Sequence, residues 1–300
     1  MIKANIARFF YWINERQAIY LNRQAGWEWP WTDDKILQTY SFTNPFREND
    51  KVTVWLRENW REPFADHPCL YLNLAMFRQF NWPATMELTG FVVDDPVDID
   101  GTSVNYVWDP QKLTDVVEVY QRAGNKVYTG AYMIRGPCIN PTGIQWTTKA
   151  QYMFHKVLDP LWWADEPDWQ NMSLQEATKW FQQFEGFGPF LSYEVATDMR
   201  HTRYLENAPD IMTWANPGPG AMRGIHRLYN WPAKSTRKKE GWYVEQMQHL
   251  LKISPDYLED YVPALEMRDI EHSLCEADKY ERVKTGEGRP RSKFIPPHLR

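Results

Sequence analysis

The chain has 300 residues, a formal net charge of −5, and 43% hydrophobic and 15% aromatic residues. This composition supplies a core and excludes a chain that is disordered throughout. The acidic balance argues against a protein that coats nucleic acid by charge alone, so any such contact must be local. Basic residues cluster at 234–240 and in the C-terminal tail, where a solvated surface explains them as well as a binding site does.

Cysteine usage and hydropathy indicate the compartment. Three Cys residues without C-x-x-C spacing argue against a disulfide framework and against a thiolate zinc site. Apolar runs are too short for a transmembrane span, and the N-terminus lacks the apolar core and cleavage site of a signal peptide. We therefore expect a cytoplasmic protein without a membrane partner.

In the first half, most segments have the periodicity of helices, which predicts a mainly α fold. Asn44 and Pro45 predict the start of a helix that runs to about residue 60. Residues 69–80 predict a buried helix, and residues 91–108 an acidic loop or short strand. A further helix is predicted over 109–124, between a capping Asp and a terminal Gly.

The second half is helical again. Ser173 and Glu176 form a capping-box pattern, and residues 254–283 predict one long helix or two, broken near Pro263. The sequence has no internal repeat and no clear linker; residues 94–100 and 140–143 are candidate boundaries. We expect a single helical domain of 1–300 with an N-terminal lobe at about 1–150, a hairpin lobe at 151–233, and C-terminal helices with a basic tail at 234–300.

The stretch FEGFGPFLSYEVATDM (184–199) joins two apolar-periodic segments through Gly186, Phe187 and Gly188. The order helix, Gly-hydrophobe-Gly, helix is typical of the helix-hairpin-helix motif of DNA glycosylases and related DNA-binding proteins. Backbone N–H groups of such a turn suit a phosphate. A corner between two packed helices produces the same pattern, but the neighbouring motifs favour the DNA-binding interpretation.

Two motifs follow the hairpin. Asp210 lies at about the separation at which that glycosylase superfamily places a carboxylate beside a flipped nucleotide, although a helix cap explains it as well. Gly218 and Gly220 precede Arg223 at a helix start, where backbone N–H groups can cradle a phosphate. No G-x-x-x-x-G-K-[ST] occurs, so the chain does not resemble a P-loop kinase.

The chain resembles a bacteriophage-centred family in three stretches: FTNPFRENDKVT at 42–53, GPGAMRGIHRL at 218–228 and DIEHSLCEADKYERVKTGEGRPR at 269–291. Its members are alpha-glutamyl/putrescinyl thymine pyrophosphorylases, or amino acid:DNA transferases, related to the helical domain of 5-hydroxymethyluracil DNA kinases. The resemblance covers most of the chain. It implies a fold similar to the helix-hairpin-helix DNA glycosylases.

The resemblance also implies a step in thymine hypermodification. A kinase first places pyrophosphate on the 5-hydroxymethyl group of a uracil in DNA, and the transferase then displaces it with an amine. Phosphate-binding groups would stabilise the leaving pyrophosphate, and a carboxylate or His would take the amine proton. The implied partners are DNA carrying modified uracil, an amino acid or polyamine, and that kinase. No cofactor follows from the sequence, apart from a divalent metal ion that can accompany the pyrophosphate.

The expected site residues, taken from the hairpin pattern and from the resemblance, fall into three groups. The expected catalytic residues are Arg47, Asp50, Asp210, Arg223, Glu271 and Lys279. The expected substrate-binding residues are Asn44, His272, Glu276 and Tyr280, and the expected DNA-binding residues are Gly186, Phe187, Gly188, Gly218, Gly220, Arg289 and Arg291.

Structural explanations stand beside these roles. Arg47 and Asp50 also suit an i,i+3 ion pair on a solvated helix. His272 and Glu276 are too few ligands for a metal site and also suit a surface hydrogen-bonded pair. Arg289 and Arg291 also suit a disordered tail.

Two other functions are open. One is a DNA glycosylase that uses Asp210, although the sequence around Asp210 differs from those enzymes and the hairpin helix carries no Lys. The other is a non-catalytic DNA-binding helical module that assists a 5-hydroxymethyluracil DNA kinase.

Overall fold

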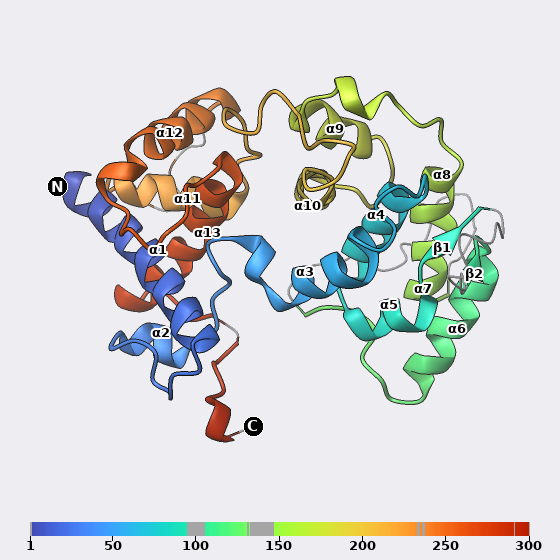
Figure 1. Cartoon of the computed structure of the whole chain (residues 1–300), viewed down its shortest axis with the longest axis horizontal. Helices are drawn as coiled ribbons and strands as arrows, with labels where there is room; N and C mark the ends of the chain where they lie inside the picture. The colour runs from blue at the N-terminus through green and yellow to red at the C-terminus, as the bar shows by residue number, and fades with distance from the viewer. Residues whose placement is uncertain are drawn as a thin grey trace. The chain divides into compact units, whose positions relative to one another are not determined.

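The computed structural model is mainly helical, as the sequence predicts (Figure 1). No helix in the part of the chain that it describes is long and apolar enough to cross a membrane. The candidate boundary at 140–143, most of that at 94–100, and Arg291 lie outside the described residues. The described residues are 2–94, 106–130, 132, 147–232, 235, 238–290 and 292–299.

The chain divides into two compact units, and the first is built from two separate stretches of sequence. Unit 1 contains residues 1–50 and 210–300, and unit 2 contains residues 51–209. These divisions differ from the lobe boundaries expected at 150 and 233. They differ because the N-terminal helix packs against α11 and α13 near the C-terminal end, so residues far apart in the sequence form one unit.

Unit 1 is a set of helices assembled around one long C-terminal helix, α13. Helices α1 and α11 both pack on α13, and α12 and α2 also contact it. Its elements are α1 (Ile2–Gln24), α2 (Lys35–Thr39), a 3-10 turn (Arg47–Asn49), α11 (Pro219–Leu228), α12 (Glu240–Ile253), a 3-10 turn (Ser254–Asp256), α13 (Met267–Lys284) and a 3-10 turn (Pro297–Leu299).

Unit 2 combines shorter helices with one two-stranded parallel ladder, in which Val92 pairs with Tyr106. The acidic region predicted as loop or short strand thus includes a short strand. The elements are α3 (Lys51–Leu56), a π-helix (Arg57–Arg61), α4 (Leu70–Phe80), α5 (Pro83–Thr89), β1 (Val92–Val93), β2 (Tyr106–Val107), α6 (Pro110–Arg122), α7 (Lys149–Gln151), a π-helix (Tyr152–Leu158), α8 (Asp159–Trp162), a 3-10 turn (Trp169–Asn171), α9 (Leu174–Phe181) and α10 (Pro189–Met199).

Local capping signals in the sequence are confirmed where they were strongest. The Asp109 side chain accepts a hydrogen bond from the Lys112 N–H at 2.9 Å, and Gly124 has a φ of +87° after the end of α6. Ser173 and Glu176 form both hydrogen bonds of a capping box at the start of α9.

Two predicted helices begin later than expected. Asn44 does not cap a helix, because its side chain bonds the Asn49 carbonyl and Asp50; a 3-10 turn follows, and α3 begins only at Lys51. The region near Pro263 is an irregular connection between the Ser254–Asp256 turn and α13, which begins at Met267. Residues 254–283 are therefore not one helix.

The core of unit 2 holds a buried ion pair between α4 and α10. All residues of α4 are buried, which confirms the predicted buried helix. Arg78 donates from Nε and Nη2 to the two carboxylate oxygens of Asp198, each at 2.5 Å. Arg78 also bonds the Asn81 side chain at 3.1 Å and lies 3.9 Å from Glu194. This bidentate geometry fixes the helices relative to each other, because neither charge is exposed to water.

Loss of one member of this pair should destabilise unit 2 strongly. We expect Asp198→Asn to lower the free energy of unfolding by about 3–5 kcal/mol, since it removes the bidentate carboxylate that bonds the buried Arg78 and leaves Glu194 only at 3.9 Å. Urea unfolding measures this change. The exposed pair Arg122–Glu118, at 3.2 Å, provides the control: Arg122→Ala should change stability by no more than about 0.5 kcal/mol. Equal effects of the two substitutions would contradict the assignment.

Candidate functional site

Helix α13 brings together the three stretches that carried the family resemblance. Its buried stripe consists of Ile270, Leu274 and Ala277, as predicted from their spacing. The flanks of this stripe face different partners. One flank meets the Gly-rich stretch of α11, and the other meets the stretch at 42–53. The three motifs are therefore adjacent in unit 1 although they lie far apart in sequence.

The contact between α11 and α13 depends on two glycines one helical turn apart. A Cβ at Gly220 would overlap the Sγ of Cys275, and a Cβ at Gly224 would overlap the Leu274 carbonyl oxygen. Gly218 caps α11, and its N–H donates to the Glu271 side chain at 3.2 Å. Helix–helix packing thus explains Gly220, whereas the predicted contacts of Gly218 and Gly220 with DNA phosphate stay predictions.

An arginine cluster surrounds the fully buried carboxylate of Asp278. Arg223 and Arg227 donate from Nε to its two oxygens at 2.9 and 2.7 Å, and Arg282 lies at 3.4 Å. The Arg223 and Arg282 side chains remain about one third exposed. Arg227 also pairs with Glu287, which supplies a second negative charge. Two carboxylates do not neutralise three guanidinium groups, so the cluster keeps a surplus of positive charge at its surface.

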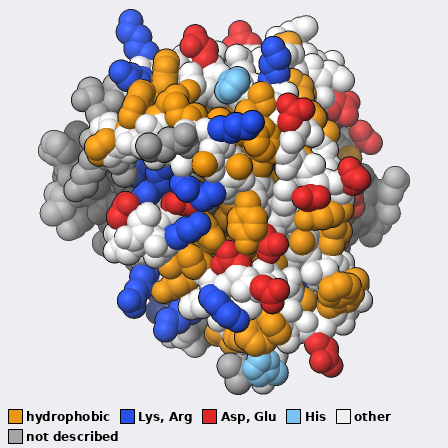
Figure 2. All heavy atoms as spheres, turned by 90° about the vertical axis from the view of Figure 1, so that its left-hand side faces the viewer, with side chains coloured by type: hydrophobic (Ala, Val, Ile, Leu, Met, Phe, Trp, Pro, Cys, Tyr) orange, Lys and Arg blue, Asp and Glu red, His pale blue; other side chains and the backbone are white. Residues whose placement is uncertain are grey.

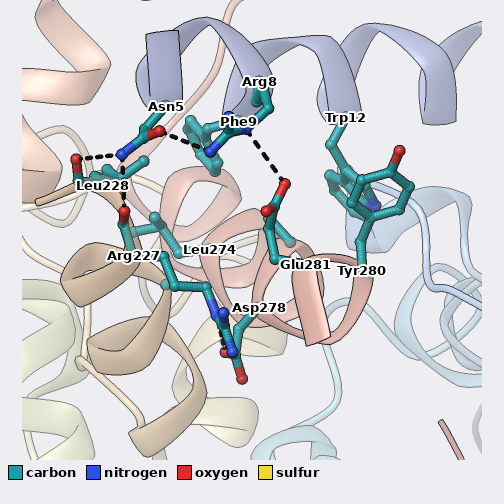
Figure 3. Close-up of a pocket in the computed structure, with 12 residues that line it drawn as sticks. Asn5, Arg8, Phe9, Trp12, Arg227, Leu228, Leu274, Asp278, Tyr280 and Glu281 are labelled. Atoms are coloured by element: carbon teal, nitrogen blue, oxygen red, sulfur yellow. Dashed lines mark hydrogen bonds and ion pairs between the residues drawn. The ribbon is translucent and has the colours of Figure 1, made fainter. Parts of the chain in front are cut away.

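The cavity beside this cluster is a packing gap and not a substrate site. Figure 3 shows Asn5 and Arg8 of α1 facing the end of α11 and the outer side of α13. The Asn5 amide donates to the carbonyls of Arg227 and Leu228 at 3.1 and 3.0 Å, which satisfies groups that a helix end leaves open. The cavity has a volume of about 30 Å³, room for about one water molecule.

The carboxylate cluster lies on the other flank and consists of Asn44, Arg47, Asp50, Glu276 and Lys279. Asp50 is held by one oxygen only: Oδ1 accepts from the Asn44 N–H and from the Asn44 amide, both at 3.0 Å. Its Oδ2 is buried and accepts no hydrogen bond within the described part of the chain. The nearest cation is Arg47, whose Nη1 lies 4.0 Å from that oxygen.

Thr43 joins this cluster to α13. Its N–H donates to Glu276 at 3.2 Å, and its hydroxyl lies 2.7 Å from His272 Nε2. Glu276 is also paired with Lys279, one turn further along α13. His272 and Glu276 therefore bond the same residue of the first motif, and the described residues contain no group of three or more metal-ligating side chains.

The two carboxylates of the cluster have opposite pKa shifts. Burial raises the pKa of Asp50, and Arg47 and the Asn44 N–H offset this only in part. Burial also acts to raise the pKa of Glu276, but Lys279 and His272 outweigh it and hold the pKa below its ordinary value. A carboxylate with a raised pKa and an unbonded oxygen is the better proton acceptor near neutral pH. Asp50 therefore has the properties of a general base, and Glu276 those of a fixed anion.

The stretch predicted to form a DNA-binding hairpin consists of α9 and α10 of unit 2, joined by a short turn. Gly186 has a φ of +83°, and a Cβ there would lie 2.7 Å from Val157. Phe187 is buried against Phe181, with ring centroids 5.9 Å apart, so its side chain anchors the turn. Gly188 caps α10 and has open space around it. A packed corner and a DNA-binding hairpin share this geometry, so the DNA contact stays a prediction.

The other predicted site residues, Asp210, Tyr280 and Arg289, do not belong to the carboxylate cluster. Asp210 lies in a turn before α11, where its backbone carbonyl accepts from the Thr213 N–H at 2.9 Å. The Tyr280 hydroxyl donates to Asp34 at 2.6 Å, which ties α13 to the start of α2. Arg289 is exposed beyond the end of α13. Sequence reasoning missed Arg16, whose buried guanidinium bonds Asn44, because helix α1 carries no motif.

Positive charge is unevenly distributed over the surface despite the net charge of −5. Figure 2 shows Lys and Arg side chains gathered on one half of the face that it draws, with more of the Asp and Glu side chains on the other half. Such local charge permits attraction of a polyanion that the whole protein would repel.

Because α11 packs closely on α13, a Gly→Ala substitution at their contact should destabilise the protein, whereas one elsewhere should not. We expect Gly224→Ala to lower the free energy of unfolding by about 1–3 kcal/mol, because the helices must separate to admit the methyl group. Gly241→Ala in α12 is the matched control, since no atom lies within 4 Å of that Cβ. It should leave stability unchanged or slightly raised. Thermal unfolding of both variants tests this, and equal stability of the two would refute the packing argument.

Asp269, at the start of α13, predicts a pH dependence of stability. Burial raises the pKa of Asp269 to about 7, although the Glu266 N–H donates to it at 2.9 Å. The folded protein then holds a proton that the unfolded chain, with a pKa of about 4, releases. Stability contributed by this site should fall as pH rises from about 4 through about 7.

Asp269→Asn should therefore reduce the difference in urea midpoint between pH 5 and pH 8. The control is Glu176→Gln, at the same capping position of α9, where hydrogen bonds from Ser173 lower the pKa of Glu176. Because Glu176 is ionised at both pH values, that variant should keep the wild-type difference. An unchanged difference in Asp269→Asn would rule out the titration of this carboxyl.

Comparison with known proteins identifies the family. The family model of the 5-hmdU DNA kinase, helical domain, matches residues 3–289. A 5-hmdU DNA kinase of Bacillus phage SP10 is 26% identical over 292 residues, which cover 90% of this chain and 44% of that protein. The chain thus spans less than half the length of this curated relative, and no solved structure matches it. Because the family model covers nearly the whole chain, the chain belongs to the 5-hmdU DNA kinase helical-domain family.

Proposed function

We propose that this protein modifies DNA in thymine hypermodification, as a transferase that displaces pyrophosphate from 5-pyrophosphoryloxymethyluracil with an amine. The similarity to a phage 5-hmdU DNA kinase supports the pathway. The family model of the 5-hmdU DNA kinase helical domain covers residues 3–289 of this chain, which supports a role in the same modification of DNA.

The proposal depends mainly on how the two carboxylate oxygens of Asp50 are bonded. Its Oδ1 is fixed by two donors of Asn44, and its buried Oδ2 accepts no hydrogen bond within the described residues. Such a carboxylate is oriented and desolvated, which raises its basicity. In the proposed step, the amine nitrogen forms a bond to the 5-methylene carbon while the carbon–oxygen bond to pyrophosphate breaks. The amine proton passes to Asp50 Oδ2, and pyrophosphate leaves with the bonding electrons.

Cations around the two clusters suit the leaving group. Arg47 lies 4.0 Å from Asp50, and Lys279 is partly exposed beside Glu276. In the arginine cluster, Arg223 uses Nε for Asp278 and remains about one third exposed. Guanidinium and ammonium groups stabilise departing phosphate charge. We assign Arg47 and Lys279 to the pyrophosphate, and Arg223 to it or to an adjacent DNA phosphate. A divalent metal ion carried by the pyrophosphate is compatible with these roles.

The hairpin of unit 2 is the proposed contact with the DNA backbone. The turn at Gly186–Gly188 leads into the N-terminus of α10, whose first N–H groups have no partner within the helix. Gly188 is exposed and open, which leaves room for a phosphate. A fold similar to the helix-hairpin-helix glycosylases is part of this proposal. In the alternative, the same hairpin belongs to a DNA-binding module that assists a kinase without turnover.

A direct assay tests the reaction. The full chain is incubated with DNA containing 5-pyrophosphoryloxymethyluracil and a mixture of amino acids and polyamines, and the digested nucleosides are analysed by mass spectrometry. We expect an amine adduct and released pyrophosphate. Asp50→Asn should lower the rate of adduct formation by about 10²-fold or more, because an amide cannot accept the proton.

Asp256→Asn, an exposed Asp of the same unit outside both clusters, is the matched control and should keep the wild-type rate. Undiminished adducts in a double Arg47→Ala, Asp50→Ala variant would show that the site is elsewhere. Abasic sites in place of adducts would indicate a glycosylase. Retained DNA binding with an unchanged base would indicate the non-catalytic module.

A further inference from the structure

Unit 1 contains a second cavity, of about 200 Å³, which the proposed reaction does not use. It lies between α1, α2 and the C-terminal residues around Phe294. We call it the aromatic pocket. Its defining residues are Arg16, Arg23, Trp29, Trp31, Phe42 and Phe294. Pockets for drug-sized ligands have volumes of roughly 300–1,000 Å³, so this pocket suits a smaller group.

The floor of the pocket carries a buried positive charge. Arg16 is 7% exposed; its Nε donates to the carbonyl of Thr43, and its Nη2 donates to the carbonyl of Phe42 and the amide oxygen of Asn44. None of these acceptors is a carboxylate, and no ion pair of Arg16 occurs in the described structure. Burial lowers the pKa of Arg16 to about 10, although the nearby charges of Asp50 and Glu276 act to raise it, so Arg16 stays charged at neutral pH. A buried guanidinium that no carboxylate bonds directly can still bond an anion.

The rim adds a second cation and flat ring surfaces. Arg23 lies on the same side of α1 as Arg16, two turns along, with its guanidinium carbon 5.2 Å from the centroid of the Trp31 ring. Trp31 in turn meets Phe294 edge-on, with ring centroids 5.9 Å apart. No Asp or Glu occurs among the described residues that line the pocket. The lining therefore combines two positive charges with several aromatic rings.

Two positive charges beside aromatic rings favour some reactants of the proposed reaction over others as the occupant of this pocket. A polyamine is disfavoured by the two arginines. A nucleotide offers a flat ring for the aromatic side chains and a phosphate for the guanidinium groups, which is how proteins hold unstacked bases. Enzymes that act on a base inside a duplex must turn it out of the stack into such a pocket.

We propose that the aromatic pocket binds one pyrimidine nucleotide of the DNA substrate, turned out of the duplex, with its base against Trp31 and its phosphate on Arg16 and Arg23. The inference rests on the proposed function for the identity of DNA as the partner. Two hydrogen bonds link the pocket to the carboxylate cluster: Arg16 donates to Asn44 at 3.3 Å, and Asn44 donates to Asp50 at 3.0 Å. A nucleotide bound in the pocket is thereby connected, through Arg16 and Asn44, to Asp50, the proposed general base.

Fluorescence anisotropy of labelled duplexes tests this inference without turnover. One duplex contains a single unpaired 5-hydroxymethyluracil, and the other contains the same base fully paired. We expect tighter binding of the unpaired duplex, competed by free 5-hydroxymethyl-dUMP and not by glutamate or putrescine. Arg23→Gln and Trp31→Ala should each weaken binding of the unpaired duplex about tenfold, with little effect on the paired one.

Lys3→Gln is the matched control, since it removes one positive charge from the same helix outside the pocket. It should change both affinities by less than about twofold. Equal losses for the control and the pocket variants would indicate general charge attraction and overturn the proposal. Competition by glutamate would place an amino acid in the pocket, and competition by free nucleotide without preference for the unpaired duplex would place a free nucleotide there. Either result overturns it.

The binding experiment and the transferase assay can succeed or fail independently of each other. Wild-type protein that forms adducts without any preference for the unpaired base refutes the pocket and leaves the function intact. A clear preference without adducts supports the pocket and refutes the transferase. The competition experiment uses only wild-type protein, so it decides the matter even if a pocket variant fails to fold.

Discussion

The close approach of α11 to α13 is the constraint on which the rest of unit 1 depends. With Gly220 and Gly224 at the contact, the backbone of α11 touches Cys275 and the Leu274 carbonyl. This approach brings Arg223 and Arg227 within hydrogen-bonding distance of Asp278. The opposite flank of α13 is left free to hold the stretch at 42–53. A larger residue at either glycine would move the arginines away from their carboxylate, so packing and electrostatics are set by the same two positions.

Unit 1 also concentrates charge where burial is costly. Arg16, Asp50 and Glu276 are largely removed from water, and each retains its place through bonds to backbone groups or to Asn44 and Thr43. Neutral groups of Asn44, Phe42 and Thr43 orient Arg16 and Asp50 without cancelling their charge, whereas Glu276 is also paired with Lys279. Asn44 bonds both Arg16 and Asp50, which are not paired directly. Such a separation is what a site needs if its cation and its base are to act on other molecules.

Sequence reasoning succeeded where short-range physics decides and failed where distant segments meet. The helix at 109–124 and the capping box at Ser173 depend on residues within one turn, and both are confirmed. Asn44 followed by Pro45 has the same local signal, but its side chain bonds Asp50 and no helix begins there. The meeting of Thr43 with His272 and Glu276, more than 200 residues away, has no local signal, and the resemblance alone grouped these stretches. The buried pair of Arg78 with Asp198, 120 residues apart, likewise has no local signal in the sequence.

The discontinuity of unit 1 has a consequence for the order in which the molecule forms during synthesis. Residues 51–209 are complete as a unit before any of α11, α12 or α13 has been made. Helix α1 precedes unit 2 in the chain, yet its buried residues Phe9, Phe10 and Trp12 cannot be fully covered until α13 has also been made. The first part of unit 1 therefore exposes an apolar stripe while the ribosome makes residues 51–209. The two separate stretches that form the proposed active site meet only after α13 has been made.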